Sequence, residues 1–462
     1  MPSDLAKLQR SDREHHFHPF TDFKALGERG TRVIVRGDGV YVWDHEGNKL
    51  LDAMSGLWNV NVGYGRRELV DAATRQLETL PYYNSFFQCT TEPAILLAER
   101  LAGLGGERFS HVFYAGSGSE ANDTQIRLVR RYWQLAGAPD KRIIISRRNA
   151  YHGSTIGAAS LGGMTPMHAQ GELPIPGITH VEQPYHFGAG VRGPAEASAE
   201  AFGAAVARRL EEKILALGAD RVAAFIGEPI QGAGGVIIPP ENYWHEVQRI
   251  CRRYDVLLIA DEVITGFGRL GAWFAHQRMG FEPDLVTFAK GVTSGYVPLG
   301  GVLVGERVAR VLAAGGGEFA HGYTYSGHPV ACAVALANLD VLEREGLPQR
   351  VRDDIGPYFA RGWQALAARH RIVGEARSFG LMGALELVRD GRERFDASLR
   401  MGERCRDAAI DYGLVMRAVG DTLVVAPPLI ISHTEMDELL DKADRVLESV
   451  AAGVSGARPR AR

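Results

Sequence analysis

Two short apolar runs of this chain each carry an ionisable residue of a kind that can do chemistry. The first run, residues 257–263, contains Asp261, and the second, residues 285–290, ends in Lys290. A short apolar run of this kind is typical of a strand that is buried on both faces, as in a parallel sheet. Open parallel sheets bind ligands at the carboxyl ends of their strands, so we expect the two side chains to meet there. A purely structural ion pair is the alternative interpretation.

This pair matches what pyridoxal phosphate requires from a protein. The cofactor needs a lysine for its Schiff base and an acidic partner for its pyridinium nitrogen. Burial lowers the pKa of a lysine, which makes its amine a nucleophile. The sequence therefore predicts that Lys290 binds pyridoxal phosphate and that Asp261 lies beside the ring nitrogen.

A glycine-rich turn at residues 116–122 follows a predicted strand at 111–114 and precedes a predicted helix. Strand, glycine-rich turn and helix together form a phosphate site, because exposed backbone N–H groups and the helix dipole face the anion. Ser117 and Gly118 lie at the centre of this turn. The turn is thus a candidate site for the cofactor phosphate.

The same turn also fits a loose dinucleotide-binding fingerprint. The next predicted strand, residues 142–146, is followed by Arg147 and Arg148, which could hold the 2′-phosphate of NADP. An NADP-linked oxidoreductase is therefore a second hypothesis from a different class of enzyme.

Two more side chains stand at predicted strand ends. Tyr151 follows the strand at 142–146, where its ring could stack on a planar ligand or could be an ordinary loop tyrosine. Glu228 follows a buried strand at 222–226. Strands and helices alternate through this middle third of the chain, which predicts a doubly wound α/β domain.

Composition excludes several classes of partner. The chain has 462 residues, with 52 basic and 55 acidic side chains and a net charge of −3, so we expect neither nucleic acid nor anionic membrane as a partner. The four cysteines are scattered, which indicates no disulfide framework and a reducing compartment. The first residues lack an apolar core and no run approaches roughly 18 apolar residues, so the prediction is a cytoplasmic protein.

The stretch 14–20 is rich in histidine and aromatic residues. Clustered histidines can bind metal, but we expect no carboxylate or thiol to complete a ligand set there and predict no metal site. The stretch is interpreted as an arm that packs across a surface or a partner, with Phe20 able to reach a pocket.

Four units are predicted along the chain. Residues 1–75 form an N-terminal arm and a segment of a small domain, and 76–330 form the large α/β domain. Residues 331–452 form a C-terminal small α+β unit, and 453–462 a disordered tail. An exposed insertion is expected at 188–199 because large apolar residues are few there.

With these motifs in hand, the sequence resembles the class III aminotransferases of the pyridoxal-phosphate fold-type I group. The resemblance covers nearly the whole chain and rests on five motifs in order, at residues 116–122, 151–153, 228–232, 261–269 and 289–291. It is greatest to the ω-transaminases that use pyruvate, the amine–pyruvate and polyamine–pyruvate enzymes. The resemblance implies a large, mainly parallel-sheet α/β domain and a smaller α+β domain built from the N- and C-terminal parts.

The resemblance also implies roles around the cofactor. Lys290 would form the Schiff base and move the substrate proton, and Asp261 would keep the ring nitrogen protonated. Ser117, Gly118, Tyr151, Glu228 and Val263 would complete the cofactor site, with Tyr151 and Val263 on opposite faces of the ring. Thr324 would reach the phosphate from a partner subunit, which implies a homodimer, or a tetramer, with shared active sites.

For the substrate, the resemblance implies an apolar pocket lined by Phe20, Trp58, Phe86 and Phe87. Arg417 would clamp the carboxylate of pyruvate or alanine and swing away for an uncharged amine, a task that suits its planar fork. A surface ion pair is the alternative interpretation of this arginine.

Two departures from related families narrow the substrate. Relatives that act on ornithine or γ-aminobutyrate carry a glutamate where this chain has Ala233, and a glutamine where it has Ile264. Both differences favour pyruvate over 2-oxoglutarate as the acceptor. The leading hypothesis is a ping-pong aminotransferase that moves an amino group from a primary amine, a polyamine or an ω-amino acid to pyruvate; a 2-oxoglutarate enzyme is the alternative.

Overall fold

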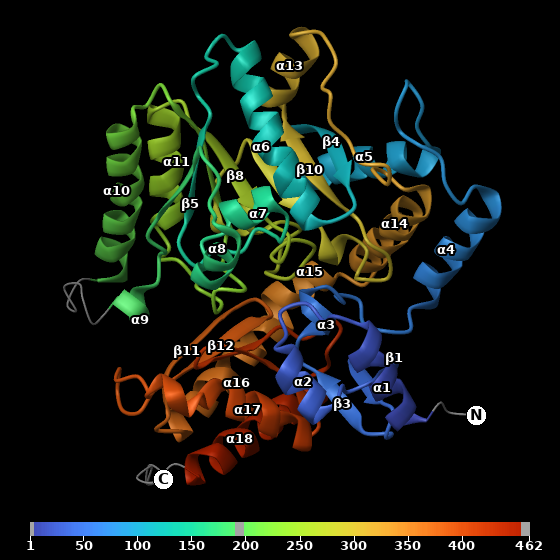
Figure 1. Ribbon diagram of the computed structural model, residues 1–462, viewed down its shortest axis with the longest axis vertical. Coiled ribbons are helices and arrows are strands. Elements are labelled where there is room, and N and C mark those ends of the chain that lie inside the picture. Colours follow the sequence, from blue (N-terminus) through green and yellow to red (C-terminus); the bar gives the residue numbers. More distant parts are fainter. Residues whose placement is uncertain (1–3, 190–197, 454–462) are drawn as a thin grey trace.

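The computed structural model describes residues 4–189 and 198–453 of the chain. Most of the predicted insertion at 188–199, and the predicted tail after Gly453, lie outside the described residues. The upper half of the molecule in Figure 1 is built on one large sheet, and the lower half holds two smaller sheets. No helix within the described ranges is long and apolar enough to cross a bilayer.

The large sheet has seven strands in the order β4-β10-β9-β8-β7-β5-β6. All neighbours from β6 to β9 are parallel, and β10 runs antiparallel to both β9 and β4. In chain order the strands are β4 (Phe109–Ala115), β5 (Ile143–Arg147), β6 (Ile178–Val181), β7 (Val222–Gly227), β8 (Leu257–Asp261), β9 (Leu285–Phe288) and β10 (Gly300–Gly305). The predicted α/β architecture with a mainly parallel sheet is confirmed.

Successive side chains of β8 enter two different cores, as the alternation of a strand requires. Leu257 and Ile259 pack in the core under α6, whereas Leu258 and Ala260 pack in the larger core on the other face. Every residue of β8 is buried. This two-sided burial is the reason for the continuous apolar run in the sequence.

Helices cover both faces of the large sheet (Figure 1). Those of this half are α4 (Arg67–Thr79), α5 (Glu92–Gly105), α6 (Gly118–Leu135), α7 (Ile156–Leu161), α8 (Thr165–Gly171), α9 (His186–Ala189), α10 (Ala199–Leu217), α11 (Tyr243–Arg253), α12 (Ala275–Met279), α13 (Glu306–Ala314) and α14 (Pro329–Arg344). Helix α14, which the sequence analysis assigned to the C-terminal unit, packs on α4 and α5.

The lower half combines the two ends of the chain. One sheet has the order β1-β2-β3-β13 and joins β1 (Ile34–Asp38), β2 (Tyr41–Asp44), β3 (Lys49–Asp52) and β13 (Leu414–Val415). The other has the order β11-β12-β15-β14 and joins β11 (Val373–Phe379), β12 (Met382–Leu387), β15 (Thr422–Val425) and β14 (Arg417–Val419). Because β13 pairs with β3, N- and C-terminal segments share one sheet, as the resemblance implied.

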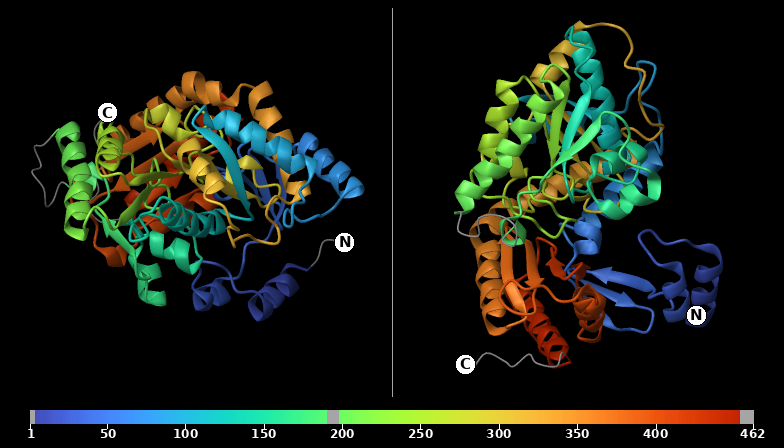
Figure 2. Two further views of the ribbon diagram at one scale, coloured as in Figure 1. Left: turned by 90° about the horizontal axis from the view of Figure 1, so that it is seen from above. Right: turned by 60° about the vertical axis from the view of Figure 1, so that its left-hand side comes forward.

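Within the described residues, seven α-helices complete this half. They are α1 (Leu5–His15), α2 (Phe23–Arg29), α3 (Ser55–Trp58), α15 (Leu347–Arg350), α16 (Gly356–Arg369), α17 (Met401–Asp411) and α18 (His433–Ala452). Figure 2 shows the segment with α1 and α2 projecting from the side of the molecule. Neither of these two helices has a buried residue.

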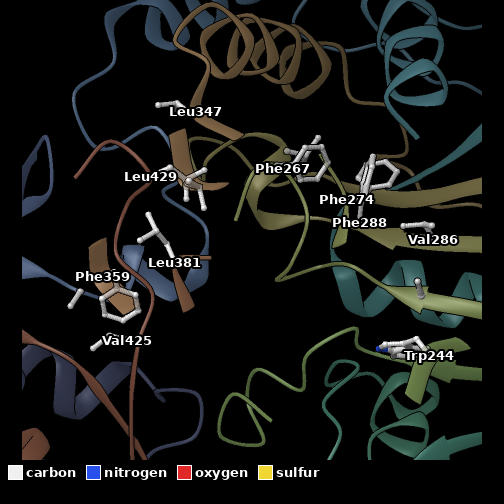
Figure 3. Packing of buried hydrophobic residues seen from close by; sticks show 14 of the residues in the cluster. Trp244, Phe267, Phe274, Val286, Phe288, Leu347, Phe359, Leu381, Val425 and Leu429 are labelled. Carbon is white, nitrogen blue, oxygen red and sulfur yellow. The ribbon is translucent and has the colours of Figure 1, made fainter. Parts of the chain in front are cut away.

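A continuous apolar core joins the two halves. Figure 3 shows it running from Phe288 and Phe267 on the right of the view to Leu429, Leu381 and Phe359 on the left. Arg269 is fully buried at this junction and donates to the carbonyl oxygens of Leu381 and Pro427. The carboxyl edge of the large sheet therefore faces the lower half, and residues from both halves can meet there.

Candidate active site

A cavity of about 390 Å³ opens at the carboxyl edge of the large sheet. Its wall includes seven of the predicted cofactor residues, namely Ser117, Gly118, Tyr151, Glu228, Asp261, Val263 and Lys290. Strands β8 and β9 are neighbours, so Asp261 and Lys290 come from adjacent strand ends. The structure thus brings together residues that lie up to 173 positions apart in the chain.

Lys290 begins a 3₁₀ turn, residues 290–292, directly after β9. Its φ of 49° lies in the left-handed region, a conformation that costs free energy for a residue with a side chain and is often found at functional sites. Burial lowers the pKa of Lys290 to about 8, against the attraction of Asp261 and Glu228 and with a small further lowering by Arg417. The amine is therefore far more nucleophilic at neutral pH than an exposed lysine.

Three donors hold the carboxylate of Asp261. His152 Nδ1 and Asn122 Nδ2 each lie 2.7 Å from Oδ2, and the backbone N–H of Val263 lies 3.1 Å from Oδ1. The side chains of His152, Asn122 and Asp261 are all buried. The sequence analysis did not assign a role to His152 or Asn122, although both stood inside motifs that it singled out.

Behind these donors lies a second row of buried polar groups. Thr287 Oγ1 donates to Asn122 Oδ1 over 2.8 Å and accepts from Gln125 Nε2 over 3.1 Å. Ser146 Oγ lies 3.2 Å from His152 Nε2. These hydrogen bonds fix the orientation of the Asn122 amide. The amide oxygen already accepts from Thr287, so the amide nitrogen points toward Asp261.

The turn before α6 has the features of an anion site. Ser117 caps the helix by accepting from the N–H of Glu120, and the Glu120 carboxylate in turn accepts from the N–H of Gly116. The N–H groups of Gly118 and Ser119 open the helix on the cavity wall, where helix geometry leaves them without an intrahelical partner. A phosphate group fits here because these donors and the helix dipole point the same way.

Backbone packing shapes the cavity floor. Gly153 has a φ of 137°, and a Cβ atom there would stand 2.7 Å from the Cα of Ser119. A Cβ on Gly118 would meet the side chain of Val263 at 3.0 Å. Glycine is needed at residue 153 so that the loop after β5 can approach the start of α6.

Glu228 is buried and organises two loops of the site. Its Oε1 accepts from the N–H of Tyr151 over 3.0 Å, and its Oε2 accepts from the N–H of Gly232 over 2.9 Å. Burial raises the pKa of this carboxyl group. Through the first bond Glu228 holds the backbone that presents Tyr151 to the cavity.

The predicted substrate residues Phe20, Trp58 and Arg417 lie near the cavity but not on its wall. The ring of Phe20 stands edge-on to Tyr151 with 6.2 Å between centroids, and three-quarters of this residue is exposed. Trp58 is buried with Ile264 in a small core, and its indole N–H has no partner among the described residues. Leu57 and Asn59, its neighbours in the chain, line the cavity.

Arg417 is the first residue of β14. Burial lowers the pKa of its guanidinium, and Tyr151 is the group that opposes this lowering. Among the described residues no carboxylate lies within 4.0 Å of it. Ala233 is buried and is not part of the cavity wall, whereas Ile264 lines the cavity.

Phe86, Phe87 and Thr324 lie apart from the cavity of their own chain. The loop that carries the two phenylalanines is tied to the loop of Thr324, because Tyr82 donates to the Thr324 carbonyl over 2.7 Å. Phe87 is 90% exposed. Their predicted roles would need a second copy of the chain.

The two arginines that motivated the NADP hypothesis are engaged elsewhere. Arg147 is fully buried, donates to the carbonyl oxygen of Glu228 and lies against Trp244. Arg148 pairs with Glu182 over 3.0 Å. Burial therefore withdraws Arg147 from a nucleotide in solution, and the guanidinium of Arg148 is directed to Glu182.

Comparisons with known proteins agree with this site. The family model described as "Aminotransferase class-III" matches residues 25–447. A putrescine–pyruvate aminotransferase of Pseudomonas aeruginosa is 53% identical over 96% of this chain and 97% of its own, and a diaminobutyrate–2-oxoglutarate transaminase of Halomonas elongata is 44% identical over 95% of each chain.

A solved structure shares the fold over nearly the whole chain. It is a thermostable (S)-enantioselective ω-transaminase from Thermomicrobium roseum, 44% identical, with a TM-score of 0.93 over 97% of this chain and 99% of its own. The fold, the cavity and these similarities agree, and the chain belongs to the class III aminotransferases, a family of enzymes that depend on pyridoxal phosphate.

Proposed function

We propose that this enzyme transfers an amino group from a primary amine, a diamine or polyamine, or an ω-amino acid to pyruvate, giving alanine and an aldehyde or ketone in a ping-pong reaction. The observation that carries the proposal is a lysine of lowered pKa and a buried, three-fold bonded aspartate in one cavity. The name of the Pseudomonas aeruginosa relative, a putrescine–pyruvate aminotransferase, supports this donor class and acceptor.

The residues present fit pyridoxal phosphate. Ser117, Gly118 and Ser119 would take the phosphate at the start of α6, and Asp261 would meet the ring nitrogen. When bound, the cofactor supplies an aldehyde for amine capture and a ring that accepts electrons from the bond being broken. Lys290 on the cavity wall would supply the amine for that aldehyde, and Tyr151 and Val263, which also line the cavity, are candidates for the two ring faces.

The chain's own residues then carry out positioning and proton transfer. The free amine of Lys290, with its pKa lowered to about 8, would be largely neutral at slightly alkaline pH and would take a proton from the donor carbon. The carboxylate of Asp261 would hold a proton on the ring nitrogen, and His152 with Asn122 would keep that carboxylate in place. Glu228 would set the height of Tyr151 over the ring through its backbone bond.

Acceptor selection would rest on Arg417. Its guanidinium has no carboxylate partner in the described part of the chain and is largely withdrawn from water, so a substrate carboxylate would gain a charge-assisted bidentate bond. The apolar Ile264 on the cavity wall favours a small acceptor such as pyruvate over 2-oxoglutarate. 2-Oxoglutarate is the alternative acceptor, which the name of the diaminobutyrate–2-oxoglutarate relative supports.

We also propose a homodimer with shared active sites, with a tetramer as a larger assembly of the same dimer. Phe87 is 90% exposed and Tyr325 is 64% exposed, and their two loops are joined by hydrogen bonds. Together they form an aromatic face that a second copy would cover. In such a dimer Phe86, Phe87 and Thr324 would complete the partner's site. We further propose a cytoplasmic location, because the four cysteines are free thiols.

The test is a panel of donors assayed with each acceptor. Putrescine, an ω-amino acid and an arylalkylamine, each with pyruvate, should form alanine, and replacement of pyruvate by 2-oxoglutarate should lower kcat/KM by at least tenfold. In parallel, Lys290→Ala should remove the visible absorption band of the cofactor-bound enzyme. Equal rates with both acceptors would contradict the pyruvate assignment, and an unchanged band would contradict the role of Lys290.

Sedimentation equilibrium checks the dimer.

A further inference from the structure

Three potential metal ligands gather at the end of helix α1, outside the active site. Asp12, His16 and His18 each present a ligand atom, and these atoms all lie within 4.8 Å of one another. Asp12 and His18 are partly buried, and His16 is exposed. The reaction described above uses none of them.

One carboxylate oxygen faces both imidazole rings. Asp12 Oδ1 lies 3.1 Å from His16 Nδ1 and 2.9 Å from His18 Nε2. The other oxygen, Oδ2, accepts from the hydroxyl of Thr31 and also lies 2.9 Å from His18 Nε2. The threonine thereby holds the carboxylate in one orientation, with Oδ1 toward the two rings.

Local geometry explains why these residues converge. Asp12 and His16 are four positions apart across the last turn of α1, so their side chains share one helix face. His18 follows after the helix has ended and folds back, with its ring centroid 4.3 Å from that of His16. His15 lies on the same arm but outside this cluster. The sequence analysis expected no carboxylate here because it considered residues 14–20 alone, and Asp12 stands one helix turn before His16.

We propose that Asp12, His16 and His18 form a binding site for a divalent transition-metal ion, with Zn²⁺ the best fit. Two imidazole nitrogens and one carboxylate oxygen are a donor set that Zn²⁺ accepts, and a fourth position stays open to water. Ligand bonds of about 2.0–2.2 Å in tetrahedral geometry separate the donor atoms by about 3.3 Å. The two oxygen–nitrogen distances observed here are shorter by only a few tenths of an ångström, so a small outward movement makes room for the ion.

Binding of the metal ion replaces the present hydrogen bonds between Asp12 and the two histidines with coordination bonds. The ring nitrogens that now face the carboxylate must present a lone pair to the ion, so a neutral ring shifts its proton to its other nitrogen and a protonated ring releases one proton to solvent. Thr31 keeps its bond to Oδ2 and acts as an outer partner that orients the ligating carboxylate. No change in oxidation state is involved.

The site also connects to the arm that reaches the active site. His18 is followed by Pro19 and Phe20, and the Phe20 ring packs edge-on against Tyr151. A bound ion would link α1 to the start of this short segment and restrict the positions of Phe20. The metal site does not depend on the proposed reaction, and its test does not use activity.

The test is titration calorimetry of the holoenzyme with ZnCl₂ in a buffer that does not bind metal, in a Cys89→Ser background that removes the exposed thiol. We expect one ion per chain. Asp12→Asn, His16→Ala and His18→Ala should each weaken binding at least 100-fold, and Thr31→Val should weaken it about tenfold as the loss of an outer partner. His15→Ala is the matched control and should change the affinity less than twofold.

Binding that is equal in all variants, or an absence of saturable binding, would overturn the proposal. So would an effect of His15→Ala as large as that of His16→Ala, because it would indicate a loosely basic arm rather than a site. The ligand side chains carry little of the fold, so the urea midpoint of each metal-free variant should match the parent. Asp12→Asn keeps the shape of the side chain and is decisive if an alanine variant unfolds.

Discussion

His152 Nδ1 lies 2.7 Å from Asp261 Oδ2, and both side chains are almost completely buried. This contact joins the loop after β5 to the end of β8, two elements separated by 109 residues in the chain. It orients the carboxylate that would meet the cofactor ring. Buried polar groups of this kind are costly when they lose a partner, so the contact has a measurable consequence.

His152→Ala should lower kcat/KM by about 10- to 100-fold, because a hydrogen bond to a charged group contributes about 1.5–3 kcal/mol. His152→Asn keeps an N–H donor near the same place and should recover part of this loss. Steady-state kinetics at saturating cofactor measures both, with the exposed His111→Ala as control. If alanine and asparagine were equally harmful, packing rather than the hydrogen bond would be the cause.

Cofactor capture should depend on pH with a midpoint near 8. Burial lowers the pKa of Lys290 to about 8, so its neutral form increases through that pH rather than through about 10.4, as for a free lysine. Below pH 8 the rate at which the apoenzyme binds pyridoxal phosphate should fall about tenfold per pH unit, since only the neutral amine attacks. Stopped-flow absorbance measures this, with an N-acetyl-lysine amide as reference. A rate that parallels the reference would contradict the lowered pKa.

Arg417→Met should raise the KM for pyruvate about 10- to 100-fold, because a charge-assisted bond to the substrate carboxylate is lost. The KM for putrescine, which has no carboxylate, should change less than threefold. Arg417→Lys keeps the charge but loses the planar fork, so its KM for pyruvate should lie between that of the parent enzyme and that of Arg417→Met. A parallel loss for both substrates would indicate that Arg417 supports the fold of β14 instead.

Arg269→Met should lower the free energy of unfolding by about 3 kcal/mol. The buried guanidinium bonds to two backbone carbonyls, to Ser55 and to Asn61, and its loss leaves these groups without a donor. Urea denaturation measures the change. Arg310→Met is the control, since Arg310 is 73% exposed with its Glu306 partner 3.6 Å away, and it should cost less than about 0.5 kcal/mol. Equal effects would argue against a special role for the junction.

The sequence by itself determined the chemistry of the centre. The apolar runs that carry Asp261 and Lys290 are typical of strands buried on both faces, and parallel strands bring such ends to one edge. The glycine-rich turn before α6 carries its own signal, because helix starts bind phosphate through local backbone geometry. Hydrophobic runs and turn-forming residues depend on neighbouring positions in the chain, so they can be recognised in the sequence.

Only the tertiary structure decided which side chains support that centre. His152 and Asn122 meet Asp261 because the loop after β5, helix α6 and the end of β8 converge, and no spacing in the sequence encodes a 2.7 Å contact. The same holds for Thr31, which reaches the Asp12 carboxylate from outside α1, and for Trp58, which is packed beside the cavity instead of on its wall. Long-range packing sets these positions, since each depends on how separate elements dock and not on the residues next to it.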